Sequence, residues 1–391
     1  MNASHWLNAT RIRTYPKIIL SLYVVIGLCA IGYWMHRVST SRFIISDLTV
    51  FWLAAHFSLE GHAASAYLPE QLYQAMSQVA PEIQNGYGWF YPPTFFLLIT
   101  PLGLLPYWAA YASFMALSLL AYVSVLRQII RGKMAMWCLA AFPGIWINFL
   151  TGQNGLLTAA LAGAGLLTLK RHPVLAGVLI GMLAIKPHLA LLFPVALLAI
   201  GAWRTLLTAG FTAVAFMVAS TTLLGTDTLD AWMKSLTLAR TIMERGGTAP
   251  LMPTVFSMMR LWHAPLVWAY GAHALLAVVA TVTVWTAWRS SVPFALKGAA
   301  LMTATLLVSP YLMEYDLAWL GLPIAWFANI GLGSGWLRGD REILLLCWTL
   351  PLFVVGLAWF AHLQVGPLCI MALLWAIMNH VMTDQRDVRA S

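Results

Sequence analysis

Apolar runs of about 20 residues recur along the chain, and they constrain its fold more than any other feature. Of the 391 residues, 61% are hydrophobic and only 9% are charged. A helix needs about 20 apolar residues to cross a bilayer, because each residue adds roughly 1.5 Å to its length. The sequence therefore predicts an all-α, polytopic integral membrane protein in which residues 1–391 form a single membrane domain.

The apolar runs predict about twelve membrane segments. We expect these segments at residues 18–36, 107–127, 134–150, 155–169, 174–185, 187–202, 205–224, 264–288, 294–310, 316–331, 342–361 and 365–382. The two segments within 174–202 are short, and they are separated by Pro187, which lacks the backbone N–H that a helix needs. They indicate a broken or re-entrant hairpin rather than two ordinary spans.

The distribution of charge predicts the orientation in the membrane, because cytoplasmic loops collect lysine and arginine. Most of the 22 basic residues fall on the loops of one face together with both ends of the chain, whereas most of the 13 acidic residues fall on the other. We therefore expect a multi-pass protein with both termini in the cytoplasm. The net charge of +9 is spread over short loops and forms no stripe, so we expect no nucleic-acid partner.

Two long loops are predicted at the outer face. The first covers residues 37–106, and its last part, 94–105, is a short apolar stretch that we expect to lie at the membrane interface. The second covers residues 225–263. Because acidic and aromatic residues concentrate on this face, the candidate functional residues are expected there.

Asp47 lies in the first outer loop of a chain that has few carboxylates. It could be a solvated loop residue or a helix cap, or it could be a general base that takes a proton from an acceptor hydroxyl. The same loop contains Trp52, Tyr67 and Tyr91, whose rings could bind a sugar or an acceptor. Aromatic side chains also form belts at membrane interfaces, so both interpretations stay open.

Lys186 and His188 lie at the tip of the predicted hairpin, on either side of Pro187. Placing a lysine at the centre of a membrane helix costs roughly 2.5–3.5 kcal/mol, so the position calls for a reason. One reason would be a donor phosphate or lipid bound by the cation and a helix amino terminus. The alternative is a lysine whose long side chain reaches the outer interface.

Two polar segments at the outer face complete the set of candidates. Gln153 and Asn154 form either an ordinary turn or a group of donors and acceptors for sugar hydroxyls. Glu314, Tyr315 and Asp316 form the second segment, which we also expect to contact the sugar or acceptor. Its two carboxylates could hold a divalent ion, but they lack a third ligand, and the four cysteines have no metal-type spacing. We therefore expect neither a metal site nor a cofactor.

Taken in order, these segments resemble glycosyltransferase family 87 over about residues 40–330. The joint order of the motifs is more specific than any single one. The motifs are Ser46-Asp47 before Phe51-Trp52, Glu60-Gly61 with Tyr67, Phe90-Tyr91-Pro92-Pro93, Pro101-Leu102 with Leu105-Pro106, Gly152-Gln153-Asn154, Ala176-Gly177 through Ala184-Ile185-Lys186-Pro187-His188, and Ser309-Pro310-Tyr311 with Tyr315-Asp316.

The resemblance implies a GT-C fold and a glycosyltransferase that uses a polyprenyl-phosphate sugar, similar to the α-mannosyltransferases of phosphatidylinositol mannoside synthesis. Such an enzyme would transfer a sugar, mannose foremost, to a lipid or glycan acceptor at the outer face of a bacterial inner membrane, with inversion. Asp47 would then be the catalytic base, and Lys186 would contact the donor phosphate or lipid. The chain departs from the family pattern at His188 and around Glu314, which leaves the donor contacts of the late loop and the identity of the sugar open.

The residues also allow a different class of protein. A transporter or flippase of a lipid-linked sugar or other amphiphile would share the hydrophobicity, the broken hairpin and the intramembrane lysine. It would be expected to show internal pseudo-symmetry and polar residues toward both faces, and the sequence shows neither.

Overall fold

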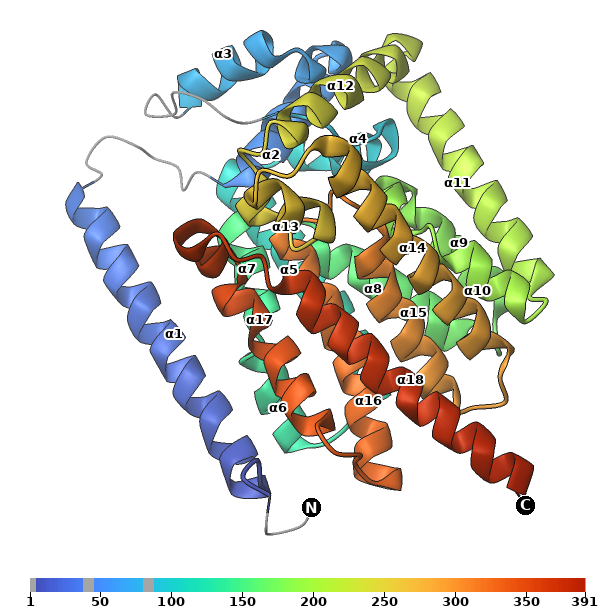
Figure 1. Cartoon of the computed structure of the whole chain (residues 1–391). Helices are drawn as coiled ribbons and strands as arrows, with labels where there is room; N and C mark the ends of the chain where they lie inside the picture. Colours follow the sequence, from blue (N-terminus) through green and yellow to red (C-terminus); the bar gives the residue numbers. More distant parts are fainter. Residues whose placement is uncertain (1–4, 38–45, 80–87, 391) are drawn as a thin grey trace.

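The computed structural model describes residues 5–37, 46–79 and 88–390, and within these ranges every regular element is a helix (Figure 1). Eight helical stretches in the described part are long and apolar enough to cross a membrane. They are Ala9–Cys29 in α1 (Ala9–Arg37), Tyr107–Ile129 (α5), Lys133–Thr151 (α6, Lys133–Ala140, and α7, Pro143–Thr151), Trp203–Leu224 (α11), Leu266–Arg289 (α14), Glu314–Ser334 (η6, Glu314–Leu320, and α16, Gly321–Ser334), Asp340–Ala361 (α17) and Gly366–Asp384 in α18 (Gly366–Ala390). The prediction of an all-α polytopic membrane protein is confirmed.

The remaining predicted segments are helices too short to count as spans by length. They are α8 (Gly155–Thr168), α9 (Pro173–Gly181) with η3 (Met182–Ile185), η4 (Pro187–Leu189) with α10 (Phe193–Ala199), and α15 (Phe294–Val308). In α8 and α15 most side chains are buried, and α15 is covered on all sides from Gly298 to Leu307. A helix that is apolar all round is stable when neighbouring helices surround it. Both helices therefore form the centre of the bundle.

The core is built around these two central helices. α15 packs against α14, α16 and α18, while α8 packs against α5, α9 and η6. Trp288, Trp319 and Tyr122 are among the largest fully buried side chains. The Tyr122 hydroxyl donates a 2.6 Å hydrogen bond to the carbonyl of Ala318, which ties α5 to η6. Buried polar groups of this kind need such partners, because an unpaired one costs free energy in an apolar interior.

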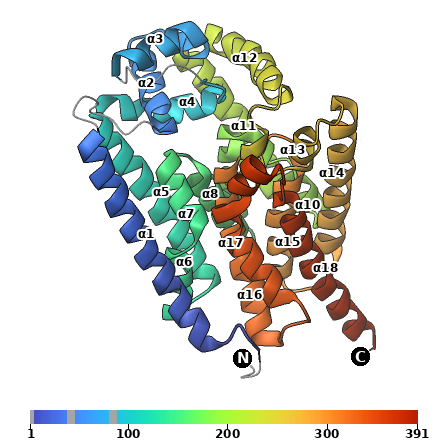
Figure 2. The ribbon, with the colours of Figure 1, turned by 60° about the vertical axis from the view of Figure 1, so that its left-hand side comes forward.

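The two predicted outer loops are largely helical and lie together at one end of the bundle. The first contains α2 (Asp47–Leu59), η1 (Ala63–Tyr67), α3 (Pro69–Val79), α4 (Pro93–Ile99) and η2 (Thr100–Leu104), with residues 38–45 and 80–87 outside the described ranges. The second contains α12 (Thr226–Glu244), η5 (Ala249–Leu251) and α13 (Val255–Leu261). We call α2, α3, α4 and α12 the helical cap. α1 begins and α18 ends at the opposite end of the bundle (Figures 1 and 2).

Candidate active site

Asp47 is the first residue of α2, in the helical cap and outside the eight spanning helices. The start of α2 is held in place by Ser46, Thr49 and Tyr107. The backbone N–H of Ser46 donates to the Thr49 hydroxyl at 3.3 Å, and the Tyr107 hydroxyl lies 3.2 Å from Thr49 Oγ1 and 3.3 Å from Ser46 Oγ. These contacts fix the backbone at the start of α2, and none of them involves the carboxylate of Asp47.

The turn between α7 and α8 brings the partner of Asp47 into position. Gly152 ends α7 with φ of +67°, a left-handed conformation that side chains with a Cβ rarely adopt. Gly155 begins α8, where a Cβ would lie 2.5 Å from the carbonyl oxygen of Tyr315. The two glycines therefore allow the tight turn and its close approach to η6, and they place Gln153 and Asn154 inside the protein.

The buried side chain of Gln153 connects Asp47 to Tyr91. Its Nε2 donates a 2.7 Å hydrogen bond to Oδ2 of Asp47, and its Oε1 accepts a 2.8 Å hydrogen bond from the Tyr91 hydroxyl. The backbone N–H of Asn154 also donates to Oε1, at 3.3 Å. Because both acceptor contacts fall on the same oxygen, the amide nitrogen must face the carboxylate. The carboxylate of Asp47 is thus held in one orientation.

Lys186 interrupts the hairpin as a non-helical residue with φ of −148° and ψ of 70°, between η3 and η4. Its Nζ donates a 2.6 Å hydrogen bond to Oδ1 of Asp316 and lies 4.4 Å from the centre of the Tyr315 ring. Lys186 and Asp316 are both buried. Oδ2 of Asp316 accepts the backbone N–H of Met313 at 3.3 Å, which begins η6. The structure therefore gives the intramembrane lysine a carboxylate partner.

The carboxylate of Asp47 and the ammonium group of Lys186 are close enough to interact electrostatically. Burial raises the pKa of Asp47, while the hydrogen bond from Gln153 and the positive charge of Lys186 oppose that rise. The carboxylate of Glu314 also interacts with Asp47, Asp316 and Lys186. A carboxyl group whose pKa is raised is a better proton acceptor once it is ionised, which suits a general base.

Several buried polar atoms around this cluster have no hydrogen-bond partner within the described part of the chain. They are Oε2 of Glu314, Nε2 of His188, and Oδ1 and Nδ2 of Asn154. Each such atom costs free energy unless a partner satisfies it. A carboxylate, an imidazole and an amide together offer the donors and acceptors that a hydroxyl-rich or anionic ligand requires.

The structure thus brings together most of the predicted residues. Asp47, Tyr91, Gln153 and Asn154 lie beside Lys186, His188, Glu314, Tyr315 and Asp316. Trp52 and Tyr67 lie apart from this group. Nε1 of Trp52 donates to the carbonyl of Leu105, at the end of η2, at 2.9 Å. The Tyr67 hydroxyl donates to the backbone carbonyl of Tyr91 at 2.7 Å, so it supports the backbone of that residue.

Asn148 belongs to the site and was absent from the sequence-based set. It is fully buried in α7, where its Nδ2 donates to the carbonyl oxygens of Gly144 and Tyr315 at 2.9 and 2.8 Å. It therefore holds η6, with Tyr315 and Asp316, against α7. An asparagine inside an otherwise apolar membrane segment was the available signal, because such residues almost always face the bundle interior.

α12 covers the site from the second predicted outer loop. It packs on η1, and Nε1 of Trp232 donates a 3.2 Å hydrogen bond to the carbonyl of Phe90, next to Tyr91. Its end is held by Glu244, whose Oε1 accepts 2.7 Å hydrogen bonds from Arg240 and Tyr270. The contacts with η1 and Phe90 join α12 to the part of the helical cap that comes from the first loop.

Glu314 and Asp316 have no third protein ligand near them, among the described residues, with which to hold a metal ion. Across residues 5–37, 46–79 and 88–390, no group of three or more histidine, cysteine, aspartate or glutamate side chains is arranged to hold an ion. Asp316 is already engaged by Lys186. Independence from a metal stays a prediction.

Comparison with known proteins identifies one family. The sequence profile of glycosyltransferase family 87 matches residues 89–310, which is more than half of the chain. The match includes Tyr91, Gln153 and Lys186, but it begins after Asp47 and ends before Glu314. No curated protein and no solved structure gives a match.

Proposed function

Because the chain belongs to glycosyltransferase family 87, we propose that it transfers a mannosyl residue from a polyprenyl-phosphate donor to the hydroxyl of a lipid or glycan acceptor, with inversion at the anomeric carbon. The protein is a membrane glycosyltransferase. The proposal concerns the donor, the sugar, the stereochemistry and the residues that perform the transfer.

The observation that carries the proposal is the orientation of the Asp47 carboxylate. Gln153 holds one of its oxygens at 2.7 Å, and Tyr91 holds Gln153 in turn at 2.8 Å. The carboxylate is partly exposed, and it belongs to a polar cluster in which Gln153, Lys186 and Asp316 are buried. A single carboxylate held in this way can accept the proton of an acceptor hydroxyl.

In the proposed reaction the acceptor oxygen attacks the anomeric carbon from the side opposite the phosphate. The bond between that carbon and the phosphate oxygen breaks, polyprenyl phosphate leaves as an anion, and the proton of the acceptor hydroxyl passes to Asp47. One bond to the anomeric carbon replaces another from the opposite face, so its configuration inverts. No further reactant is needed for the atoms and charges to balance.

Lys186 and His188 are proposed to hold the donor phosphate. The ammonium group of Lys186 has three N–H donors, and Asp316 accepts one of them. Nε2 of His188 is buried without a hydrogen-bond partner among the described residues. Positive charge near the departing phosphate would stabilise the transition state more than the ground state, because negative charge develops there as the bond breaks.

The remaining polar atoms are proposed to bind the sugar and the acceptor. Asn154 and Glu314 present unpartnered buried atoms within the described chain, and Tyr315 lies beside Lys186. Trp52 and Tyr67 act from a distance in this scheme, by supporting η2 and the backbone of Tyr91. We further propose that the capped end faces outward from a bacterial inner membrane and that both termini are cytoplasmic, in keeping with the basic loops at the opposite end.

The test compares membranes that contain equal folded amounts of the wild type, Asp47→Asn and Glu70→Gln. Glu70 is an exposed carboxylate of the same predicted loop and serves as the matched control. Transfer of radiolabelled mannose from polyprenyl phosphate to endogenous acceptors is measured, together with donor binding. We expect Asp47→Asn to bind donor but to lose roughly 10²- to 10⁴-fold in transfer, which is the usual contribution of a general base.

Each alternative outcome has a definite meaning. Wild-type transfer by Asp47→Asn would refute the assignment of the base. A wild type that transfers glucose or another sugar from its polyprenyl phosphate, and not mannose, would refute the choice of sugar alone. Movement of the intact lipid-linked sugar across the membrane without transfer would favour a flippase.

A further inference from the structure

α1 stands partly apart from the rest of the bundle (Figures 1 and 2). α1 packs chiefly against α6, where Nζ of Lys17 lies 5.3 Å from the centre of the Trp137 ring, and the Tyr23 ring lies 5.4 Å from the ring of Trp146 in α7. Before α1 begins, His5 and Trp6 both bind Oε1 of Glu342 in α17, at 3.0 and 3.1 Å. Between these two attachments the helix does not close onto the bundle.

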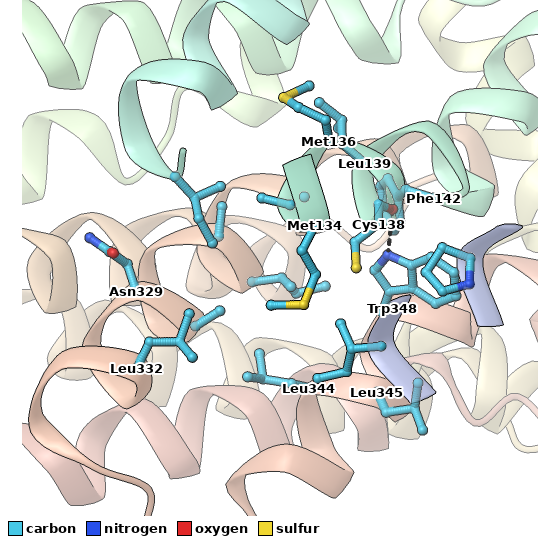
Figure 3. Close-up of a pocket in the computed structure, with 18 of the residues that line it drawn as sticks. Met134, Met136, Cys138, Leu139, Phe142, Asn329, Leu332, Leu344, Leu345 and Trp348 are labelled. Carbon is cyan, nitrogen blue, oxygen red and sulfur yellow. Dashed lines mark hydrogen bonds between the residues drawn. The ribbon is translucent and has the colours of Figure 1, made fainter. Parts of the chain in front are cut away.

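The space left there is a cavity of about 790 Å³, which we call the α1 groove (Figure 3). Its walls come from α1, α5, α6, α16 and α17, and they include Met134, Leu139, Phe142, Leu344 and Trp348. Nε1 of Trp348 is satisfied by the carbonyl of Cys138 at 3.1 Å, so it presents no free polar atom to the groove. The volume lies within the range of roughly 300–1,000 Å³ typical of small-molecule sites, and the lining suits a hydrocarbon chain.

Arginine side chains supply the charge of the groove. Arg11, Arg131 and Arg341 are among its lining residues, and these described lining residues include no aspartate or glutamate. Two nitrogens of Arg341, Nε and Nη1, are buried and have no hydrogen-bond partner in the described chain. The guanidinium lies 5.4 Å from the centre of the Trp336 ring, which holds it in place. An oxyanion would satisfy these donors, because guanidinium binds phosphate in a bidentate manner.

We propose that the α1 groove binds an anionic phospholipid, with its phosphate at the three arginines and an acyl chain along the apolar wall. Basic pockets between membrane helices are known binding sites for anionic lipid headgroups. Arg11 and Arg341 lie where α1 and α17 begin, and Arg131 lies between α5 and α6, at the end of the bundle opposite Asp47 and the helical cap. A lipid-linked sugar with its phosphate there would lie far from the candidate base, so the groove is distinct from the donor site.

The bound lipid would complete the attachment of α1 to the bundle. α1 has few buried side chains of its own, so filling the groove adds apolar contact, and the phosphate anion offsets part of the repulsion among the three arginines. A ligand that binds only the folded state raises its stability in proportion to the logarithm of its concentration over Kd. The phospholipid is therefore a structural ligand of the transferase, with no part in the transfer of the sugar.

The test uses the purified full-length protein, stripped of lipid in detergent and titrated with phosphatidylglycerol. Native mass spectrometry counts the bound lipids, and thermal unfolding measures the stabilisation. Phosphatidylcholine with the same acyl chains is the zwitterionic comparison with no net charge, and polyprenyl phosphate is a competitor. We expect one tightly bound phosphatidylglycerol, a Kd on the order of tenfold weaker in Arg341→Gln, and no displacement by polyprenyl phosphate.

Two matched controls separate charge from bulk. Arg338→Gln removes a nearby arginine that does not line the groove, and it should leave lipid binding unchanged. Ala328→Phe fills the apolar wall with every arginine retained, so it should abolish the bound lipid, whereas Ala274→Phe on the exposed side of α14 should not. If Arg341→Gln fails to fold, Ala328→Phe alone carries the test.

Three results would overturn the proposal. Equal affinity for phosphatidylglycerol and phosphatidylcholine would remove the role of the arginines. Unchanged binding by both Arg341→Gln and Ala328→Phe would place the lipid elsewhere. Displacement of phosphatidylglycerol by polyprenyl phosphate would make the groove a donor site.

Discussion

We predict that loss of the hydrogen bond between Gln153 and Asp47 changes the pH dependence of transfer. Gln153→Leu removes the donor that lies 2.7 Å from Oδ2 of Asp47 and keeps a side chain of similar size. That bond lowers the pKa of Asp47 and so opposes the effect of burial, which raises it. Its loss therefore raises the pKa of Asp47 further. Because the base must be deprotonated to act, the acidic limb of kcat/KM should move to higher pH.

The size of the effect follows from the kind of bond. A hydrogen bond to a charged group contributes roughly 1.5–3 kcal/mol. Asp47 is partly exposed, so water can replace part of the lost interaction, and the lower end of that range applies. About 1.4 kcal/mol corresponds to a factor of ten in rate. On the acidic limb, kcat/KM should fall on the order of tenfold, while the alkaline plateau should keep most of its wild-type value.

The assay measures initial rates of mannosyl transfer across a pH series with purified enzyme in detergent. Tyr91→Phe is the matched comparison, because it removes only the hydroxyl that donates to Oε1 of Gln153 at 2.8 Å. It leaves the amide and its bond to Asp47 in place, so its limb should move in the same direction by a smaller amount. Both variants are measured over the same pH series, so the shifts of their acidic limbs can be compared directly.

A uniform fall in kcat/KM at every pH would show that Gln153 contributes through binding or folding, and not through the ionisation of Asp47. A limb that moves to lower pH would contradict the sign of the argument. Either result would refute the reasoning from this hydrogen bond.

Two further predictions concern Lys186, Asp316 and metal ions. Lys186→Met leaves the buried carboxylate of Asp316 without its cation, so it should destabilise the fold by about 3–5 kcal/mol; this is checked as a lower midpoint of thermal unfolding in detergent. Lys186→Met combined with Asp316→Leu should recover most of that loss, and an equal fall in both variants would argue against the pair. EDTA should leave mannosyl transfer unchanged in the membrane assay. Of the two carboxylates that could hold an ion, Glu314 and Asp316, the second is already paired with Lys186. Activity lost to EDTA and restored by Mg²⁺ or Mn²⁺ would contradict this prediction.

The membrane helices could be predicted from the sequence because the signal is local. Each apolar residue adds its own transfer free energy, so a run of about 20 is recognisable without knowledge of its neighbours. The break at Lys186 was also local, since Pro187 lacks a backbone donor. The start of α1 at Ala9, before the predicted 18, could not be read in this way, because Arg11, Arg13 and Lys17 continue the helix without being apolar.

The candidate residues were recognisable as types, but their partners were not. Asp47 stood out as a scarce carboxylate, and Lys186 stood out as a cation within an apolar segment. The sequence allowed Lys186 a phosphate or a place at the interface, whereas the structure pairs it with Asp316, 130 positions away. Gln153 likewise lies 106 positions from Asp47. Asn148 could be recognised as a polar residue in an apolar segment, but nothing in that segment indicates that η6 packs against it.

The sequence by itself determined that this chain is a helical membrane protein and where most of its helices run, because hydropathy is a sum over neighbouring residues. The tertiary structure alone decided which polar groups meet. Gln153 reaches Asp47, and Asn148 reaches η6, only because the turn between α7 and α8 meets the start of α2 while both helices pack against η6. Such contacts depend on how buried helices pack in three dimensions, and no local pattern of residue types records that packing.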